Sequence, residues 1–381
     1  LEAADTSSSQ NTIDFTDPGF TDNKKKKKHF ISWSSRMTRR TSRNLVSISW
    51  LAAFAVFACI GCGSGERTEF INIGTAPAAG SFHPVGSAMA SAINDNLPEG
   101  RDWQAQAKGT KGSQENIRLL AQGELELALS NASITYFAAR GESGWNKKYD
   151  VRAVMTLAPN VAMFVTRADS GIRTMDDLRG KNVVTGPPGA GFEMFVGPIL
   201  EAHNLSFDDF NKKEMGQGDA VSALGDGTAD VAFLGGSLPT PSLSQACNSM
   251  DIHFIPFDDA AIDELIGKYE FFESFRDLTA DDYTDIVGTY RALNVGSMHL
   301  ITSASADEQM IYEITKLLFE KLDGDPDDPN SYSYRDKHGS LKSVSFASIQ
   351  KDTGVEFHPG AKRFFEEEAA KRSSEANTAE D

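Results

Sequence analysis

The chain has 381 residues, 40% of them hydrophobic and 24% charged, which is long enough for two globular domains and unlike a disordered or fibrous protein. Its net charge of −17 combines two regions of opposite sign: residues 1–44 hold nine Lys and Arg against five Asp and Glu, and residues 62–381 hold 28 against 49. So acidic a body repels phosphate backbones, which argues against nucleic-acid binding, and three cysteines exclude a disulfide scaffold.

The first 62 residues have the pattern of an export signal. Residues 1–36 are polar, with five consecutive lysines, and we expect them to be a non-structural extension. A basic stretch begins at Met37, and the uncharged, mostly apolar stretch 45–62 follows, which is typical of a secretory signal over 37–62. A single membrane-spanning anchor is the alternative, but the apolar stretch is short for a span and ends in small residues and cysteine.

The end of the apolar stretch resembles a lipobox, the motif before the lipidated cysteine of bacterial lipoproteins. Cys62 follows a glycine, whereas Cys59 has an aliphatic residue three positions before it, so both are candidates and Cys62 is favoured. We expect a periplasmic or cell-surface protein that touches the membrane only through this lipid anchor, with free secretion as the alternative. Residues 63–68 form a flexible tether, and Cys247, the remaining thiol, is expected to be a small buried hydrophobe.

From residue 69 onward, β-rich runs alternate with helical patterns. Strands are predicted in the first half at 69–73, 103–107, 125–129, 151–157 and 162–165, with helices at 85–97 and 113–120. A second unit with the same pattern begins near Asp169, with strands at 183–185, 230–234 and 251–256 and helices at 192–203 and 220–224. This alternation favours parallel or mixed sheets with helices on both faces.

The last part of the chain contains one strong helix signal. An amphipathic helix is predicted at 308–322, residues 323–340 read as an exposed loop, and residues 369–381 read as a disordered tail.

Motifs of the common enzyme classes are missing. The segment 186–193 has Phe192 and Glu193 where a phosphate-binding loop needs Lys and then Ser or Thr. No dinucleotide-binding glycine motif follows the first strand, no nucleophile elbow is present, and the seven histidines lack metal-ligand spacing. We therefore expect no enzymatic activity, no catalytic residue, no metal site and no cofactor.

Loops rich in glycine and hydroxyl residues follow several predicted strands, at 74–81, 109–113, 130–131, 185–191 and 235–237. In open α/β sheets, ligands bind at the carboxyl ends of strands. Loops that lead into helices also present free N–H groups, which suit a carboxylate. Each loop alone could be an ordinary turn, but the set in two similar halves favours a binding cleft.

Five segments occur in a distinctive order: INIGTAPAAGSFHPVG, KGTKGSQENIRLLAQGELELAL, SGIRTMDDLRGKNVVTGPPGAG, GDGTADVAFLGGSLPTPSL and VEFHPGAKRFFEE. Together they resemble the TAXI family of substrate-binding proteins, which serve TRAP-type secondary transporters, over about residues 69–367. The resemblance implies a two-lobed periplasmic binding protein type II fold, with mixed sheets flanked by helices and a hinge of two crossing strands near 157–168 and 250–258. Lobe one would comprise 69–160 and 257–368, and lobe two 161–256.

The resemblance also implies a function. The protein would capture a small organic anion, such as a glutamate-like amino acid or a dicarboxylate, between its lobes and deliver it to a TRAP-type membrane permease. The implied ligand contacts are Gly74, Thr75, Ser81, Phe82, Thr110, Ser113, Asn131, Thr185, Gly189, Ala190, Gly191, Gly236 and Tyr290.

Two positions depart from the family pattern and leave alternatives open. Phe82 and His83 stand where the family often has two tyrosines, and His83 is either a pH-sensitive ligand contact or a loop-packing residue. The loop 189–192 lacks both hydroxyls of the usual Gly-Ser-Gly-Thr, and its phenylalanine could narrow the pocket or stack on the ligand. A sensor for a membrane signalling receptor and an enzyme on the same fold remain alternatives, the latter with His83 and Cys247 as candidate reactive residues.

Overall fold

The computed structural model describes residues 68–78, 80–323 and 333–380. The chain divides into the unit Leu1–Gly63 and the unit Ser64–Asp381, and everything below concerns the second. The expected extension, the secretory signal with Cys59 and Cys62, and nearly all of the tether lie outside the described residues.

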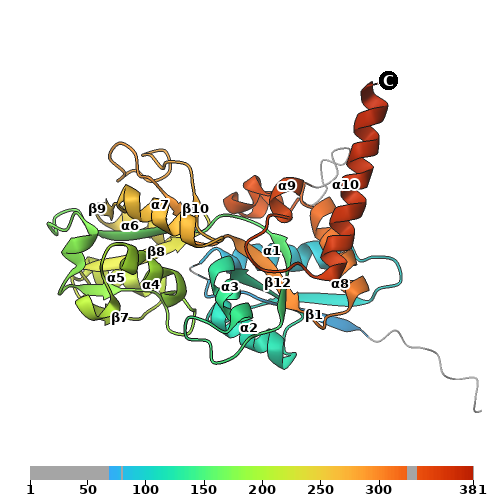
Figure 1. Ribbon diagram of the computed structural model, residues 1–381, viewed down its shortest axis with the longest axis horizontal. Coiled ribbons are helices and arrows are strands. Elements are labelled where there is room, and N and C mark those ends of the chain that lie inside the picture. The colour runs from blue at the N-terminus through green and yellow to red at the C-terminus, as the bar shows by residue number, and fades with distance from the viewer. Residues whose placement is uncertain (1–67, 79, 324–332, 381) are drawn as a thin grey trace, which may run out of the picture. The chain divides into compact units, whose positions relative to one another are not determined.

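The first sheet has five strands in the order β2-β1-β3-β12-β4 (Figure 1). β1 pairs in parallel with β2 and β3, whereas β12 is antiparallel to β3 and β4. The carboxyl ends of β1, β2 and β3 therefore share one edge of the sheet, from which their loops lead into helices. The strands are β1 (Glu69–Gly74), β2 (Trp103–Lys108), β3 (Leu127–Asn131), β4 (Val151–Thr156) and β12 (Met298–Ser303).

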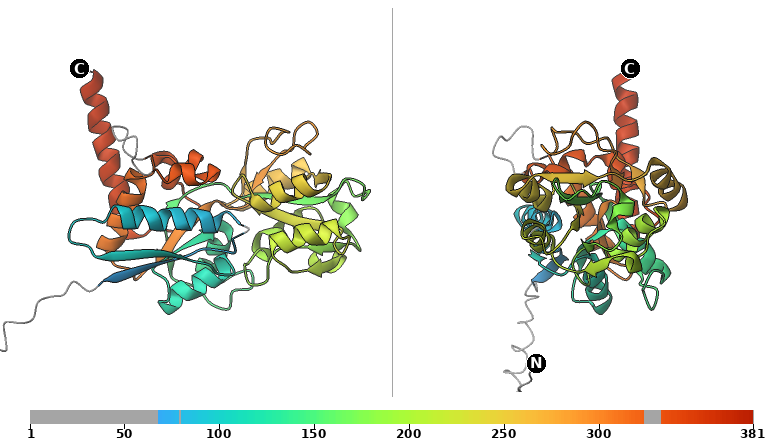
Figure 2. Two further views of the ribbon diagram at one scale, coloured as in Figure 1. Left: turned by 180° about the vertical axis from the view of Figure 1, so that it is seen from behind. Right: turned by 90° about the vertical axis from the view of Figure 1, so that its left-hand side faces the viewer.

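Helices cover both faces of the first sheet, because successive side chains of a strand point to opposite faces. Leu127 and Leu129 pack in one hydrophobic cluster with α1, α8 and α10, whereas Ala128 between them packs in another with α2 and α3. Figure 2 shows α1 in light blue and α2 in teal on opposite sides of these strands. The helices are α1 (Phe82–Asp95), α2 (Ser113–Gln122), α3 (Ala132–Arg140), α8 (Glu308–Glu320), the short α9 (Phe346–Ile349) and α10 (Pro359–Glu380).

The second sheet has seven strands, ordered β10-β11-β5-β8-β6-β7 with β9 also paired to β5. β5 is central: β11 and β9 share one of its edges, β8 holds the other, and its residues 161–166 are all buried. The strands are β5 (Val161–Arg167), β6 (Asn182–Val184), β7 (Asn211–Lys213), β8 (Val231–Gly236), β9 (Ile252–Ile255), β10 (Glu273–Ser274) and β11 (Leu293–Asn294). Their helices are α4 (Glu193–Ala202), α5 (Gln217–Gly225), α6 (Pro241–Ser249) and α7 (Asp259–Lys268). The predicted fold class, mixed α/β with helices flanking mixed sheets, is confirmed.

Two short segments connect the sheets, at 157–160 between β4 and β5 and at 295–297 between β11 and β12. They run side by side. The N–H of Val295 donates to the carbonyl of Asn160 at 2.8 Å, and the N–H of Met298 donates to the carbonyl of Ala158 at 2.7 Å. The Asn160 side chain also donates to the carbonyl of Gly296 at 2.9 Å. We call these two segments the crossing pair.

The first crossing lies within the predicted range, but the expectation of a second crossing near 250–258 is wrong. That segment forms β9, which pairs with β5, and the chain then adds α7, β10 and β11 to the second sheet before it crosses at 295–297. Residues 257–294, which the sequence placed in lobe one, therefore lie with the second sheet. β10 and β11 have only two residues each, too few to show an alternating pattern.

Two expectations about the last part of the chain are also corrected. Residues 324–332 of the segment predicted as an exposed loop lie outside the described residues, but Tyr334 in its described part is fully buried and donates its hydroxyl to the carbonyl of Leu318 at 2.6 Å. The tail predicted as disordered is helical, since α10 continues to Glu380. Among the described residues, no helix is both long and apolar enough to span a membrane.

Gly296 gives a test of the crossing pair. Its φ is +113°, and a Cβ there would lie 2.4 Å from Oδ1 of Asn131. Gly100 has a similar positive φ of +77° but nothing within 4 Å. We expect Gly296→Ala to lower the free energy of unfolding by at least about 1 kcal/mol more than Gly100→Ala does, because only the former adds a steric clash to the backbone strain. Urea denaturation of both variants measures this, and equal losses would contradict the described packing at the crossing pair.

Candidate functional site

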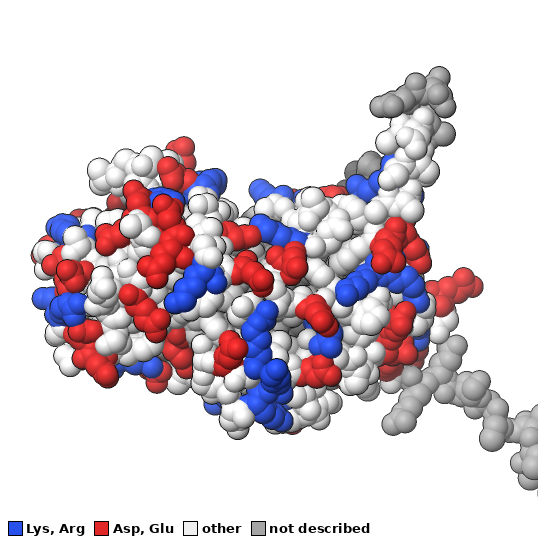
Figure 3. All heavy atoms as spheres, in the orientation of Figure 1, with Lys and Arg blue, Asp and Glu red and all other residues white. Residues whose placement is uncertain are grey.

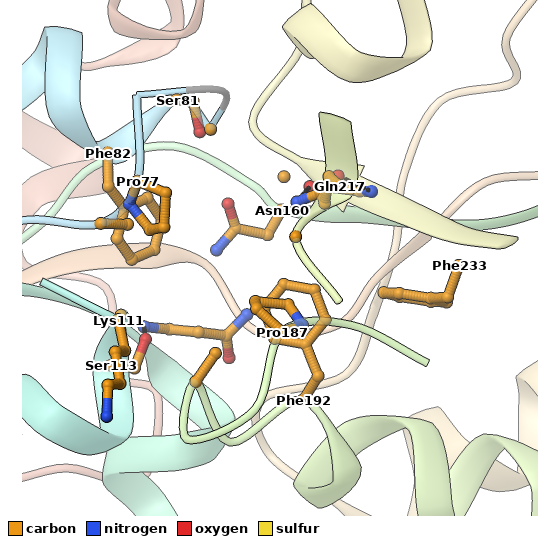
Figure 4. A pocket seen from close by; sticks show the side chains of 18 of the residues that line it. Pro77, Ser81, Phe82, Lys111, Ser113, Asn160, Pro187, Phe192, Gln217 and Phe233 are labelled. Carbon is orange, nitrogen blue, oxygen red and sulfur yellow. Dashed lines mark hydrogen bonds between the residues drawn. The ribbon is translucent and has the colours of Figure 1, made fainter. Parts of the chain in front are cut away.

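A cavity of about 250 Å³ lies where the loops of the two sheets meet at the crossing pair (Figure 4). The first sheet contributes Ala76, Pro77, Gly80, Ser81, Phe82, Lys111, Gly112, Ser113 and Asn131. The crossing segments and the start of β5 contribute Asn160, Val161 and Val295. The second sheet contributes Pro187, Ala190, Phe192, Phe195, Gly216, Gln217, Gly218, Asp219, Phe233, Gly235 and Gly236.

Six of the predicted contact residues line this cavity, namely Ser81, Phe82, Ser113, Asn131, Ala190 and Gly236. They come from all five loops that the sequence singled out, with Phe82 directly after the first of them. Their contact with a ligand stays a prediction, but the structure brings them together around one space.

Three predicted residues of the first sheet support loops instead of lining the cavity. The Thr75 hydroxyl donates to the carbonyl of Lys108 at 2.8 Å, and the Thr110 hydroxyl donates to the carbonyl of Thr75 at 2.8 Å. A Cβ on Gly74 would lie 2.5 Å from Cδ1 of Leu125, so this glycine allows close packing. These hydroxyl groups are used within the protein.

Four predicted residues of the second sheet also do not line the cavity. The N–H of Thr185 donates to the carbonyl of Lys213 at 3.0 Å, and Gly189 and Gly191 take positive φ values of +77° and +90° that shape the loop. Tyr290 is 5% exposed, packs in the hydrophobic core, and donates its hydroxyl to the carbonyl of Ile255 at 3.4 Å. This burial raises the pKa of the Tyr290 hydroxyl above its usual value.

Three polar side chains of the first sheet line the cavity, Ser81, Ser113 and Asn131, and we call them the donor corner. Ser81 precedes α1, Ser113 begins α2, and Asn131 is the N-cap of α3. All three are at least 95% buried. All three stand at helix starts on one edge of the first sheet, because β2 and β3 both pair in parallel with β1 and the three strands therefore end at the same edge.

The hydrogen bonds of the donor corner leave its donors unused. The Ser81 hydroxyl oxygen accepts from the N–H of Ser237 at 3.3 Å, and the Ser113 hydroxyl oxygen accepts from the N–H of Asn131 at 3.0 Å. Oδ1 of Asn131 accepts from the N–H of Ser133 at 2.9 Å, which fixes the other amide atom as the NH₂ group. Within the described residues, neither hydroxyl and neither N–H of this amide donates to a protein acceptor. Such a set matches a group that only accepts hydrogen bonds, such as a carboxylate.

The opposite wall is aromatic. Phe192, Phe195 and Phe233 contact one another with ring centroids 5.1, 5.7 and 5.8 Å apart, and we call them the phenylalanine wall. Phe192 precedes α4, Phe195 lies in its first turn, and Phe233 lies on β8. Sequence reasoning noted Phe192 and missed the other two, because a phenylalanine on a buried strand or helix has the same sequence signal whether it faces the core or a cavity.

Two other polar side chains of the lining are already hydrogen-bonded. The Gln217 amide donates to the carbonyl of Gly235 at 2.9 Å and accepts from the N–H of the same residue at 3.0 Å. The Asn160 amide accepts from the Ser237 hydroxyl at 2.9 Å and donates to Gly296. Lys111 and Asp219, both exposed, are the charged residues of the lining.

Loops of the second sheet touch the first sheet beside the cavity. The N–H of Gln114, in the first turn of α2, donates to the carbonyl of Ala190 at 3.2 Å. The bond from Ser237 to Ser81 joins the sheets at a second point. A ligand in the cavity would therefore contact both parts of the protein.

The two candidate reactive residues lie elsewhere. His83 does not line the cavity, and its Nδ1 lies 3.1 Å from the Thr75 hydroxyl, as expected for a loop-packing residue. Cys247, which the sequence predicts to be a buried hydrophobe, is only half-buried on α6, where partial burial and the Asp285 carboxylate raise the pKa of its thiol to about 12. No group of three or more metal-ligating side chains occurs in residues 68–78, 80–323 and 333–380.

The raised pKa of Cys247 leads to a testable expectation. At pH 8.5, iodoacetamide should alkylate Cys247 in the folded protein at least tenfold more slowly than in urea, because the thiolate is the reactive form. Asp285→Asn should increase the folded-state rate by removing the nearby negative charge. Mass spectrometry of the Cys247 peptide over time gives both rates, and equal rates in folded and unfolded protein would contradict the burial of this thiol.

A buried histidine behind the donor corner makes stability depend on pH. His299 follows Met298, which pairs with Asn131, and its Nε2 lies 2.8 Å from the Thr135 hydroxyl. Desolvation lowers the pKa of His299 to about 3, whereas an exposed histidine in the unfolded chain titrates near about 6.5. The unfolded chain therefore binds the additional proton first, and the stability that the neutral ring contributes is lost as pH falls from about 6.5 towards 3.

We expect His299→Gln to reduce this acid dependence. As the pH falls from 7 to 4, the free energy of unfolding should decrease more in the wild type than in the variant, because glutamine does not titrate. Urea denaturation at several pH values measures it. A difference that does not change with pH would show that His299 is accessible to protons in the folded protein.

The cavity between two α/β sheets joined by a crossing pair is an arrangement suited to binding a small molecule. The chain belongs to the NMT1-like family, whose model matches residues 73–368.

Solved structures similar to this chain include solute-binding proteins. They include the periplasmic aliphatic sulphonate-binding protein SsuA from Escherichia coli, at 15% identity and a TM-score of 0.39, covering 66% of this chain and 70% of that one. The alkanesulfonate-binding protein SsuA from Xanthomonas axonopodis pv. citri bound to MOPS has 14% identity and a TM-score of 0.42, covering 78% and 83%. The glycine/betaine/L-proline-binding protein ProX from Borrelia burgdorferi has 11% identity and a TM-score of 0.42, covering 65% and 82%.

Proposed function

We propose that the protein is an extracytoplasmic solute-binding receptor that captures a small organic anion and delivers it to a membrane transporter. The observation that carries the proposal is the donor corner: three nearly buried side chains line a cavity with hydrogen-bond donors for which the described protein supplies no acceptor. A donor that lines a cavity and has no protein acceptor can donate to a ligand, and an anionic group accepts such hydrogen bonds strongly. The family match over residues 73–368 is consistent with this function.

The proposed mechanism is capture by closure of two lobes. Lobe one would contain the first sheet and lobe two the second, with the crossing pair as the hinge. The sheets are joined by two segments of only three or four residues, so small backbone rotations there would move one lobe relative to the other. A ligand that contacts both lobes would favour the closed form in proportion to its difference in affinity for the two forms.

The finer parts of the proposal concern transport and location. The ordered motifs that resemble the TAXI family support delivery to a TRAP-type permease. The pattern over 37–62 supports export and a lipid anchor at Cys62 or Cys59 in the periplasm or at the cell surface. Ligand uptake by membrane vesicles that contain a TRAP-type permease, with and without the purified protein, would test the partner.

The surface gives an anion little attraction at long range. Figure 3 shows Lys and Arg interspersed with Asp and Glu over the visible face, and residues 62–381 carry 28 basic against 49 acidic residues. The attraction must therefore be local, from the donor corner and Lys111, which lines the same cavity.

A thermal-shift screen of the purified protein tests the function. Amino acids, dicarboxylates and other small organic acids at millimolar concentration should raise the melting temperature if they bind with micromolar affinity, because a ligand that binds only the folded state stabilises it. Recovery of the ligand unchanged would support a receptor. A ligand that is consumed would indicate an enzyme, and no shift with any acid would overturn the organic-anion assignment.

The variant Asn131→Asp tests the donor corner directly. It replaces the NH₂ group with a carboxylate oxygen of almost the same shape, so it removes two donors and adds a charge that repels an anion. We expect at least a tenfold loss of affinity for the acid found in the screen, since a hydrogen bond to a charged group contributes about 1.5–3 kcal/mol. Isothermal titration calorimetry measures this loss.

The folded structure should tolerate Asn131→Asp, because an aspartate oxygen can still accept from the N–H of Ser133 as the N-cap of α3. Asn211→Asp, on the exposed strand β7, is the matched control because it makes the same charge change outside the cavity. Equal affinities in both variants would contradict a role for the donor corner.

A further inference from the structure

We propose that the ligand is an aromatic monocarboxylate: one anionic head group held by the donor corner, and one ring held by the phenylalanine wall. This inference rests on the proposed function and narrows it, since a dicarboxylate or a glutamate-like amino acid would carry a second polar group.

Among the uncharged side chains described in the lining, the donor corner holds most of the unused hydrogen-bond donors. At the donor corner, two hydroxyl groups and one NH₂ group lack acceptors in the described protein. Away from it, one N–H of the Gln217 amide donates to Gly235 and one N–H of the Asn160 amide donates to Gly296, so each amide has one further N–H. A second carboxylate would therefore find one N–H on each of two separate side chains, against four donors at the donor corner, which favours a single anionic head group there.

The rest of the wall suits a flat apolar body. Phe192, Phe195 and Phe233 lie against one another on the side of the second sheet, and Phe82 approaches from the first sheet (Figure 4). Aromatic rings prefer edge-to-face or offset contacts with other rings, and a phenylalanine pocket provides them without hydrogen bonds. An aliphatic dicarboxylate would leave this surface without a matching partner.

The volume of the cavity fits a ring and a carboxylate. A dry protein cavity of about 150 Å³ can bind benzene, and a water molecule takes about 30 Å³ of the liquid. The cavity of about 250 Å³ is larger than that, which leaves space for a carboxylate beside the ring.

The two charged lining residues favour a single anionic group. Lys111 precedes α2, next to Ser113 of the donor corner, so its charge supports an anion there. Asp219 lies in the first turn of α5, on the side of the second sheet, where its carboxylate would repel a second carboxylate. An ammonium group could pair with Asp219, so an aromatic amino acid has to be compared directly with an aromatic acid.

Isothermal titration calorimetry of the full protein with five probes tests the inference. The probes are phenylacetate, benzoate, L-phenylalanine, L-glutamate and succinate. We expect phenylacetate or benzoate to bind at least tenfold more tightly than the other three. Tighter binding of glutamate or succinate would overturn the inference and leave the receptor function standing. Tighter binding of phenylalanine would overturn the conclusion that the ligand carries a carboxylate as its only polar group.

Binding of none of the five would also overturn this inference. The receptor function would then depend on the broader thermal-shift screen, so the two failures remain distinguishable.

Substitutions in the cavity give a second readout. Phe192→Ala should weaken phenylacetate binding at least tenfold. Phe82→Ala, on the other side of the cavity, should weaken it by a similar factor and serves as a second variant in case Phe192→Ala folds poorly. Phe207→Ala is the matched control, since Phe207 is also a half-buried phenylalanine on the side of the second sheet but does not line the cavity. Unchanged affinity in folded Phe192→Ala and Phe82→Ala proteins would overturn the role of the aromatic residues.

Discussion

The side chain of Asn131 is hydrogen-bonded at its oxygen, whereas its nitrogen has no partner among the described residues, and the proposed binding cavity depends on this asymmetry. The oxygen accepts from Ser133 and so begins α3, while the backbone N–H of Asn131 donates to Ser113 at the start of α2. The same oxygen lies so close to Gly296 that the crossing pair has no room for a larger residue there. One residue thus connects two helix starts, the crossing pair and the cavity, and it leaves an NH₂ group for a ligand.

In the proposed function, recognition of the ligand is divided between the two sheets. The first sheet supplies donors at the starts of three helices, because its parallel strands end at one edge. The second sheet supplies most of the aromatic surface through α4 and β8. A ligand with one anionic end and one apolar end would contact both, and its binding would favour the form in which the two sheets approach each other. The chemistry of recognition and the proposed closure therefore depend on the same set of contacts.

The sequence predicts the fold class because hydrophobic alternation and helical period are properties of adjacent residues. The amphipathic helix expected at 308–322 is observed as α8, and the glycine and hydroxyl loops do gather at one cavity. The second crossing could not be predicted, because β10 and β11 are too short to have a pattern and residues 295–297 resemble any turn.

Individual site residues were harder to predict, because the sequence does not show how a hydroxyl group is used or which way a ring faces. Thr75 and Thr110 come from the same kind of loop as Ser81 and Ser113, but their hydroxyl groups are used by backbone carbonyls. Tyr290 looks like a binding residue and lies in the core, whereas Phe233 looks like a core residue and lines the cavity.

The most direct test of this account is a crystal structure of the protein with the acid that binds most tightly. We expect the carboxylate within hydrogen-bond distance of Nδ2 of Asn131 and of the hydroxyl group of Ser81 or Ser113, with the remainder of the ligand against the phenylalanine wall. A ligand bound outside this cavity, or one whose carboxylate points away from Asn131, would contradict the central claim that the donor corner holds the anion.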